Sequence, residues 1–232
     1  MTIAEFKESN NLPFKEDTLI EQAFIHRSYI NENPRTKTTH NERLEFLGDA
    51  VLELVVTEFL YTKYPHQNEG DLTAYRSALV NAITLGEVAT SLGFNDLIRL
   101  SKGEAKDVHR ARSSILADAY EAVIGAIYLS LGYELAHRFI ATTLLIKTEE
   151  IIRKGLHKDA KSYVQEKSQE IYSFTPTYKV ISEEGPDHDK LFKVAIFFGE
   201  EQVAEGEGKS KQEAETSAAR NALVARGWVS AS

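Results

Sequence analysis

The segment ILADAYEAVIGAIYLSL, residues 115–131, carries Asp118 and Glu121 as its only charged residues. Placed three positions apart, the two carboxylates share one face of a helix. A helix that is apolar on nearly all sides is normally buried, and a buried carboxylate must be ion-paired, hydrogen-bonded, neutralised or bound to a metal. The segment therefore predicts either a structural ion pair, with Arg76 or Arg112 as candidate partners, or two ligands for a cation.

A second acidic row lies in NERLEFLGDAVLELVV, residues 41–56. Successive residues of an α-helix are about 100° apart, so the acidic side chains of this segment fall within about 80° of one another. The acidic residues are Glu42, Glu45, Asp49 and Glu53, and the apolar residues expected on the opposite, core-facing side are Leu44, Leu47, Val51, Leu54 and Val55. A solvated helix face would also explain such a row.

Two residues of the same segment do not fit a plain solvated face. Phe46 lies among the acidic residues rather than with the apolar ones. Gly48 costs about 1 kcal/mol relative to alanine in a helix interior, which indicates that another part of the molecule approaches closely at this point. Both residues favour a more specialised surface.

Two neighbouring helices of a bundle could project Glu45, Asp49, Asp118 and Glu121 into one cleft. Carboxylates about 4 Å apart repel by roughly 4 kcal/mol per pair at an effective dielectric near 20, so such a cluster favours a bound cation. Oxygen ligands without sulfur or imidazole suit Mg²⁺ or Mn²⁺ better than Zn²⁺. Because these ions orient water and stabilise the oxygens of an in-line phosphoryl displacement, the cluster predicts metal-dependent phosphoryl chemistry.

The elements that must position these acids are predicted from periodicity. Within residues 1–154, apolar residues recur at helical spacing and no strand is expected. The predicted helices cover 16–30, 40–63, 72–92, 113–131 and 134–152.

After a charged connector at 152–160 the pattern changes. Residues 161–172 are typical of a helix, and an alanine-rich helix closes the chain. Between these helices, three segments rich in β-branched and aromatic residues predict strands over 177–185, 190–199 and 202–209. The sequence therefore predicts two domains, an all-α domain over 1–154 and a small α+β domain with the order α-β-β-β-α over 158–228.

Composition limits the class of protein. The 232 residues include no cysteine, which excludes disulfides and thiolate metal sites. The N-terminal residues lack the apolar core of a signal peptide, and acidic residues interrupt the longest apolar stretches, so we expect a cytoplasmic protein without a membrane segment. A net charge of −8 argues against a nucleic-acid partner, but clustered acids that bind metal ions reverse their local sign.

Several longer motifs resemble the bacterial ribonuclease III family. NERLEFLGDAVLELV resembles the family signature and SILADAYEAVIGAIYL its second metal-binding segment, while AFIHRSY, EGDLTAYRSALVN and LSKGE fit the remaining stretches. In the C-terminal part, VQEKSQ, EEGPDH and GEGKSKQEAETSAA resemble a double-stranded-RNA-binding domain. Together the motifs cover nearly the whole chain in the family's order.

The resemblance implies an endoribonuclease that cleaves both strands of duplex RNA. Mg²⁺ is the expected cofactor, with Mn²⁺ as a substitute, and the expected products carry 5′-phosphate and 3′-hydroxyl ends. Precursors of ribosomal RNA and some mRNAs are the expected substrates, and no DNA substrate is expected. The family's metal-binding acids match Glu45, Asp49, Asp118 and Glu121.

Two further acids, Glu42 and Glu69, match residues that line the family's cleavage valley, so the implied catalytic set is Asp49, Glu121, Glu42 and Glu69. Alternative interpretations remain for both. Glu42 has the spacing of a capping box with Thr39, and Glu69 could be a solvated loop residue.

The resemblance also implies a homodimer. In the family, an aromatic residue at the position of Phe46 inserts into a pocket of the partner subunit, and Glu42 is expected at the same interface. Two identical sites on a two-fold axis match the pseudo-symmetry of duplex RNA, so that each subunit can cut one strand.

The C-terminal module is expected to contact RNA at three places. Its first helix presents Ser162, Gln165, Glu166 and Gln169, which can hydrogen-bond 2′-hydroxyls across the minor groove. His188 resembles a second minor-groove contact, although it could be a solvated loop histidine. Phosphate is expected at Lys209, Ser210 and Lys211, which open the last helix.

The module departs from the family pattern in its charge. Gln212 follows Lys211 where a second basic residue is common, and residues 158–232 contain 10 lysines and arginines against 13 aspartates and glutamates. Weak RNA binding by this module is therefore expected.

Two other functions are compatible with parts of the sequence. A non-catalytic RNA-binding protein of the same fold would not need carboxylates at all four metal-binding positions, which this chain retains. An unrelated helical metal hydrolase acting on nucleotides would not need the C-terminal module.

Overall fold

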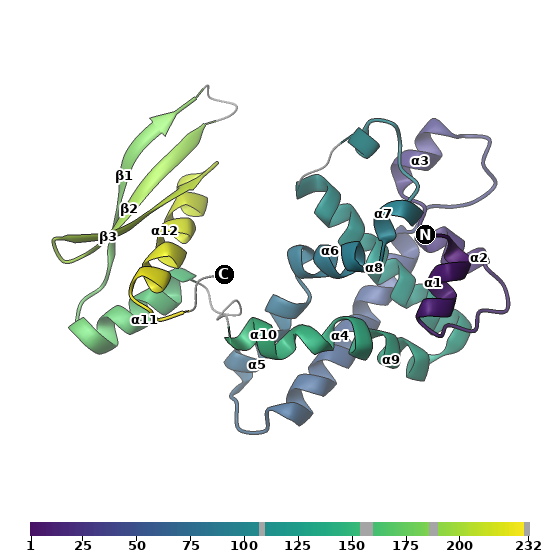
Figure 1. The fold of residues 1–232 in the computed structure, drawn as a ribbon, viewed down its shortest axis with the longest axis horizontal. Coiled ribbons are helices and arrows are strands. Elements are labelled where there is room, and N and C mark those ends of the chain that lie inside the picture. The colour runs from purple at the N-terminus through teal and green to yellow at the C-terminus, as the bar shows by residue number, and fades with distance from the viewer. Residues whose placement is uncertain (107–109, 154–159, 186–189, 230–232) are drawn as a thin grey trace. The chain divides into compact units, whose positions relative to one another are not determined.

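The computed structural model describes residues 1–106, 110–153, 160–185 and 190–229. The chain divides into two units, Met1–Ile151 and Ile152–Ser232. The first unit is helical, and the second combines two helices with a sheet (Figure 1). The predicted fold class, an all-α domain followed by a small α+β domain, is confirmed.

The helical unit is built around the apolar segment that was expected to be buried. This segment lies in α8 (Arg110–Leu131), and most of its side chains from Ile115 to Ile127 are buried. The helices packed against it are α2 (Thr18–Ala23), α4 (Glu42–Lys63), α6 (Ala82–Ser91), α7 (Phe94–Leu97) and α9 (Tyr133–Thr143). The other elements of this unit are α1 (Ile3–Ser9), α3 (Arg27–Glu32), α5 (Glu69–Leu79), α10 (Thr148–Arg153) and the 3-10 turns η1 (Glu104–Lys106) and η2 (Leu145–Lys147).

By length and composition alone, residues Arg112–Leu131 of α8 could span a membrane, although Asp118 and Glu121 interrupt the segment. The apolar window is 61% buried inside the helical unit. Its hydrophobicity is therefore that of the central helix of a helical core.

An aromatic cluster fixes the N-terminal helix, which the periodicity did not predict. Phe6 of α1 is fully buried and packs edge-on against Phe24, Phe94 and Phe139, with ring centroids 5.5 to 6.2 Å apart. Edge-to-face aromatic pairs add stability beyond the area they bury. One residue of a short helix is thus enough to attach α1 to the core.

The predicted helix over 16–30 is two helices, because the chain between them joins another segment. Ile25 forms a parallel bridge with Arg99, and the His26 amide donates a hydrogen bond to the Arg99 carbonyl at 3.1 Å. His26 then begins α3 as its N-cap. A pairing between residues so far apart in sequence leaves no periodic signal.

Two other predicted helices are interrupted as well. The one over 72–92 is divided into α5 and α6 at Asn81, whose Oδ1 accepts a hydrogen bond from the Thr84 amide at 2.9 Å. Asparagine is a favoured N-cap because it satisfies one of the free amides of a helix start. The one over 134–152 is divided into α9, η2 and α10.

α4 and α8 cross at a very short distance through two glycines. A Cβ atom on Gly48 would lie 1.8 Å from the Glu121 carbonyl oxygen, and one on Gly125 would lie 2.2 Å from the Leu44 carbonyl oxygen. Both distances are far below van der Waals contact, so the crossing accepts no side chain at either position. The close approach predicted from Gly48 is confirmed, and its counterpart is a glycine of the other acidic segment.

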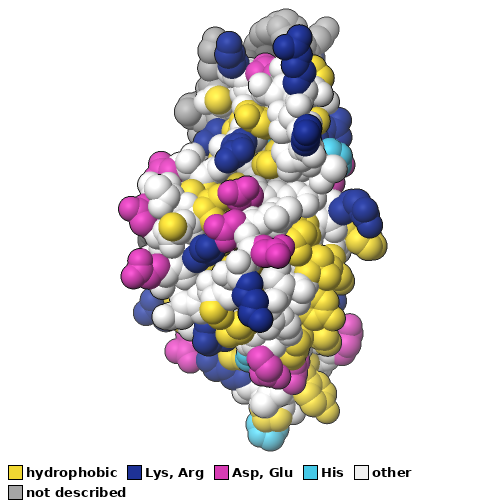
Figure 2. All heavy atoms as spheres, turned by 90° about the vertical axis from the view of Figure 1, so that its right-hand side faces the viewer, with side chains coloured by type: hydrophobic (Ala, Val, Ile, Leu, Met, Phe, Trp, Pro, Cys, Tyr) yellow, Lys and Arg dark blue, Asp and Glu magenta, His cyan; other side chains and the backbone are white. Residues whose placement is uncertain are grey.

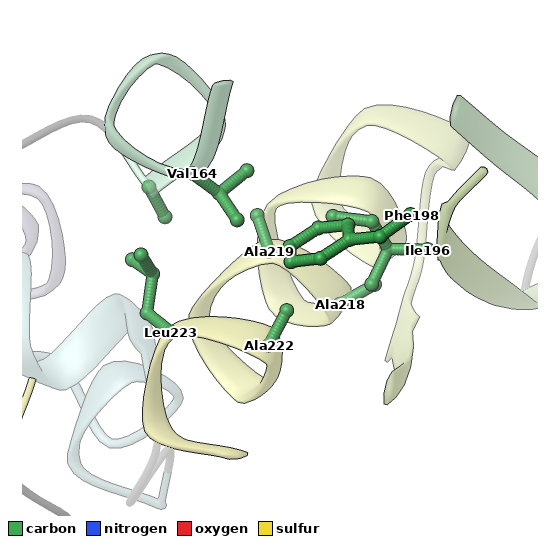
Figure 3. Packing of buried hydrophobic residues seen from close by; sticks show 8 residues of the cluster. Val164, Ile196, Phe198, Ala218, Ala219, Ala222 and Leu223 are labelled. Atoms are coloured by element: carbon green, nitrogen blue, oxygen red, sulfur yellow. The ribbon is translucent and has the colours of Figure 1, made fainter. Parts of the chain in front are cut away.

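The second unit is a three-stranded antiparallel sheet on which two helices pack. β2 (Leu191–Phe198) pairs with β1 (Thr177–Glu184) on one side and β3 (Glu201–Gly208) on the other. Val164 of α11 (Ala160–Tyr172) and small residues of α12 (Lys211–Ala225) enclose Ile196 and Phe198 (Figure 3). The α12 residues of this core are Ala218, Ala219, Ala222 and Leu223. The predicted helices and strands of this unit are confirmed to within one residue or two.

We expect Gly125→Ala to destabilise the helical unit by about 1–3 kcal/mol, because overpacking of a tight contact has this cost. Thermal unfolding followed by circular dichroism measures the loss, at about 2–4 °C per kcal/mol for a domain of this size. Gly103→Ala is the matched control, since its Cβ would be 3.8 Å from the nearest other atom. Equal melting temperatures for the two variants would contradict the close crossing.

Candidate active site and RNA-binding surface

α4 and α8 bring three of the predicted metal-binding acids together. Glu45, Asp118 and Glu121 each offer a carboxylate oxygen, and these oxygens all lie within 4.8 Å of one another. All three residues are half-buried. The spacing along each helix places the acids on facing sides, and the glycine crossing sets the distance between the two rows.

The fourth predicted ligand, Asp49, lies at the edge of this group. Its side chain is exposed and is not among the three that share the 4.8 Å sphere. Its negative charge nevertheless raises the pKa of both Glu45 and Glu121. The structure thus brings together three of the four acids and places the fourth close enough to act on two of them.

The pKa values show how strongly the cluster disfavours ionisation. Burial and the charges of neighbouring acids raise the pKa of Glu121 to about 8 and that of Glu45 to about 7. The pKa of Asp118 is raised by burial and by the charge of Glu42. Burial and like charges both penalise the carboxylate form, so full ionisation of the metal-free cluster is unfavourable.

The alternative in which Arg76 or Arg112 neutralises the second acidic pair is wrong. Arg76 pairs with Glu53 of α4 at 3.1 Å, and the Arg112 Nε donates a hydrogen bond to the Asn95 Oδ1 at 3.1 Å. Within the described parts of the chain, no lysine or arginine pairs with Glu45, Asp118 or Glu121. A half-buried, cation-free set of carboxylate oxygens fits a hard divalent metal ion.

Glu42 lies beside the cluster and does not form the capping box with Thr39. The N-cap of α4 is Asn41, which makes no capping bond; its Nδ2 instead donates to the Ala23 carbonyl at 3.1 Å. Glu42 faces two basic groups, the Arg27 Nη1 at 3.4 Å and the His40 Nδ1 at 3.7 Å. Its charge raises the pKa of Glu45 and Asp118, which places it near the predicted metal-binding acids.

Glu69 is a helical residue, so its interpretation as a loop residue is wrong. It is the first residue of α5, and its Oε1 accepts a hydrogen bond from the Thr73 hydroxyl at 3.0 Å. It lines a hollow of about 450 Å³ together with Thr57 and Tyr61 of α4. The structure does not bring Glu69 into the group of three carboxylates.

An apolar surface accompanies the acidic row of α4. Phe46 is 82% exposed and borders a hollow of about 780 Å³ that Leu129 of α8 also lines. Leu54 and Tyr61 are also exposed, so the assignment of Leu54 to the core is wrong. Figure 2 shows exposed hydrophobic side chains gathered in a band on one face of the helical unit. A solvated face would not need such a surface.

Residues 16–148 match the ribonuclease-III-like family. The chain belongs to the ribonuclease III family. The curated Ribonuclease 3 of Borreliella afzelii is 42% identical over 223 residues, which cover 96% of this chain and 91% of that protein. The Ribonuclease 3 of Bdellovibrio bacteriovorus is 43% identical, covering 90% of each chain.

The solved structures agree with this assignment. A structure of the nuclease domain of ribonuclease III from Campylobacter jejuni, described for flexibility in a region involved in dimer formation, aligns with a TM-score of 0.54. It is 41% identical, and the alignment covers 61% of this chain and 97% of that one. This ribonuclease III is accordingly a hydrolase, and the alternatives of a non-catalytic RNA-binding protein and of an unrelated nucleotide hydrolase are wrong.

Residues 160–224 of this ribonuclease III match the double-stranded RNA binding motif, so double-stranded RNA is its partner. The predicted groove-contacting residues are exposed on α11 and line one hollow of about 420 Å³. They are Ser162, Gln165, Glu166 and Gln169. His188 lies outside the described residues.

The predicted phosphate contacts surround the start of α12. Ser210 is the N-cap, and its Oγ accepts a hydrogen bond from the Glu213 amide at 3.1 Å. Lys211 is the first helical residue and pairs with Glu183 of β1 at 2.9 Å. Lys209 is exposed beside them. Sequence reasoning missed the acidic partner of Lys211, because strand and helix are distant along the chain.

Sequence reasoning also missed Gly125 and the basic groups beside Glu42. Gly125 carries the same signal as Gly48, a glycine inside a helix, and could have been found. Arg27 and His40 come from outside the helix that they flank and carry no such signal.

We expect Glu121→Gln to stabilise the metal-free enzyme at a pH just above 8. The folded-state pKa of Glu121, about 8, exceeds its unfolded value, so ionisation costs stability as pH rises from about 4.5 through 8. After allowing for solvent screening, the gain should be about 1–2 kcal/mol, or about 2–8 °C. Melting temperatures in EDTA measure it, and the gain should vanish near about pH 4.5, where the wild-type carboxyl is also neutral.

Excess MgCl₂ should then raise the melting temperature of the wild type more than that of Glu121→Gln, because the variant has lost one ligand. Glu87→Gln, at an exposed position of α6, serves as control and should follow the wild type. A metal-free Glu121→Gln protein no more stable than the wild type above pH 8 would contradict the repulsion within the cluster.

Proposed function

We propose that this enzyme hydrolyses both strands of double-stranded RNA with Mg²⁺ as cofactor and Mn²⁺ as a substitute, leaving 5′-phosphate and 3′-hydroxyl ends. The observation that carries the proposal is the convergence of Glu45, Asp118 and Glu121 within 4.8 Å, without a cationic partner among the described residues, in a ribonuclease III. A divalent ion bound there supplies an activated water and stabilises charge on the phosphate oxygens.

The residues of the chain have distinct proposed roles. Glu45, Asp49, Asp118 and Glu121 hold the metal, with Asp49 joining the other three from the exposed edge. Of these, Asp49 and Glu121 are also members of the proposed catalytic set. Glu42 keeps its carboxylate beside the cluster through its contacts with Arg27 and His40, and Glu69 contributes from α5. Because burial excludes water from one side of the cluster, its carboxylates interact with a cation more strongly than exposed acids would.

The second unit supplies selectivity for RNA. Hydroxyl, amide and carboxylate groups on α11 hydrogen-bond the 2′-hydroxyls that distinguish RNA from DNA, which is why no DNA substrate is proposed. Phosphate is held at the start of α12. The proposed contacts are Ser162, Gln165, Glu166, Gln169, His188, Lys209, Ser210 and Lys211. The proposed division of labour is a nuclease domain over 1–154 and an RNA-binding domain over 158–228.

A homodimer is the proposed assembly. Phe46 is too exposed for a core residue and lies beside an apolar hollow, so a two-fold axis can place the ring of one subunit in the hollow of the other, close to Glu42. Precursors of ribosomal RNA and some mRNAs are the proposed substrates, in the cytoplasm.

Glu121→Gln should abolish cleavage of a long RNA duplex in Mg²⁺ and leave duplex binding intact, because it removes a ligand charge with little change in volume. Excess EDTA should stop the wild type in the same way, and Ca²⁺ should support poor cleavage, since its looser coordination positions the reacting groups less well. Gel analysis of the products, with Glu87→Gln as the active control, measures both. Near-normal turnover by Glu121→Gln would refute the metal-site assignment.

Phe46→Ala should shift the enzyme from dimer to monomer at low concentration, since a buried aromatic anchor at an interface is typically worth about 2 kcal/mol or more. Sedimentation velocity over a range of concentrations detects the shift. The control is Ile83→Ala, which removes an exposed apolar side chain from a different helix, α6, and should leave the dimer unchanged. A wild type that sediments as a monomer at micromolar concentration would refute the proposed assembly.

A further inference from the structure

A salt bridge occupies Lys211, one of the lysines proposed to contact RNA phosphate. Its Nζ lies 2.9 Å from the Oε1 of Glu183 on β1 and 5.6 Å from the centre of the Phe192 ring on β2. Both partners come from the sheet, while Lys211 begins α12. The contact therefore holds the ammonium group against the sheet at the start of the helix.

Glu183 is a fully charged partner at neutral pH. The hydrogen bond from Lys211 lowers the pKa of the Glu183 carboxyl, and the positive charges of Lys211 and Lys190 lower it further. Both side chains of the salt bridge remain partly exposed, at 57% for Lys211 and 39% for Glu183. A phosphate could thus approach Lys211 without any rearrangement of the core.

A second carboxylate meets the backbone at the same helix start. Glu213 accepts a hydrogen bond from the Lys209 amide at 3.0 Å, and its own amide donates to Ser210. Amides and the helix dipole favour an anion at this end of a helix. In the free protein, Glu183 thus pairs with the Lys211 ammonium group and Glu213 accepts a hydrogen bond from the Lys209 amide. Two groups of the proposed phosphate site therefore already contact carboxylates of the same chain.

We infer that Glu183 competes with RNA phosphate for Lys211, and thereby limits the affinity of the enzyme for duplex RNA. This inference rests on the proposed role of Lys211 in RNA binding. RNA phosphate displaces the Glu183 carboxylate from the Lys211 ammonium, so part of the attraction between lysine and phosphate is offset by the loss of the salt bridge. Exposed ion pairs are weak, and the competition therefore reduces affinity without preventing binding.

The competition also predicts the salt dependence of binding. Affinity for a nucleic acid falls with salt in proportion to the number of phosphates that the protein neutralises. A lysine already neutralised by a carboxylate contributes less than one full phosphate contact. Removal of the Glu183 charge should therefore tighten binding most at low salt and make the salt dependence steeper.

The test measures Kd for a perfect RNA duplex over a range of NaCl concentrations, with full-length protein. Every variant also carries Glu121→Gln, and gel analysis verifies that the duplex stays intact. Glu183→Gln should lower Kd about two- to fivefold at physiological ionic strength, the range expected for an exposed ion pair. The log–log salt slope should steepen by up to about one unit.

Glu184→Gln is the matched control. It removes the same charge from the next residue of β1, whose side chain points to the other side of the strand. Its effect on Kd should be much smaller than that of Glu183→Gln. An equal effect would show that only the net charge of the module matters, and would overturn the inference.

Lys211→Ala separates the inference from the proposed function. Alone it should raise Kd, and in its presence Glu183→Gln should no longer tighten binding. If Lys211→Ala leaves Kd unchanged in a protein with a normal circular dichroism spectrum, the proposed phosphate contact is wrong, and the inference falls with it. Suppose that Lys211→Ala weakens binding. If Glu183→Gln then fails to tighten binding, or tightens it equally in the Lys211→Ala background, the competition is refuted and the phosphate contact of Lys211 stands.

Discussion

The close crossing of α4 and α8 is the constraint on which the candidate active site depends. Gly48 lies against the Glu121 carbonyl and Gly125 against the Leu44 carbonyl, so the two backbones touch where the acidic rows face each other. Metal–oxygen distances are fixed within a few tenths of an ångström. A side chain on either glycine would push the helices apart by more than this tolerance, and the carboxylates on the two helices would separate with them. Two glycines without any functional group therefore determine whether the three carboxylates can share one ion.

This crossing makes the cluster electrostatically unfavourable when it holds no cation. Burial and mutual repulsion raise the pKa values of its carboxyls, and the nearby arginines are engaged elsewhere: Arg76 with Glu53, Arg112 with Asn95 and Arg27 with Glu42. A buried salt bridge would neutralise the acids permanently. Among the described residues no lysine or arginine pairs with these acids, so a divalent ion is a group that fits the cluster and would relieve the repulsion.

The second unit handles charge in the opposite way. Several of its described lysines pair with carboxylates on the surface, as in Lys161 with Glu215, Lys193 with Glu205 and Lys211 with Glu183. Such exposed pairs contribute little to stability. They reduce the positive potential that the module offers to RNA, which is consistent with a domain in which acidic residues outnumber basic ones.

The sequence by itself determined the identity of the acids, their placement on one side of each helix, the close approach at Gly48 and the strands of the second unit. These features depend on local spacing, because the periods of helix and strand fix which side chains share a face. Only the tertiary structure decided that Glu45 joins Asp118 and Glu121 while Asp49 stays at the edge, and that Leu54 is exposed. It also decided that Arg76 pairs with Glu53 and that Lys211 pairs with Glu183. The physical reason is that such contacts depend on how separate elements cross, and local spacing contains no information on the crossing of helices from distant parts of the chain.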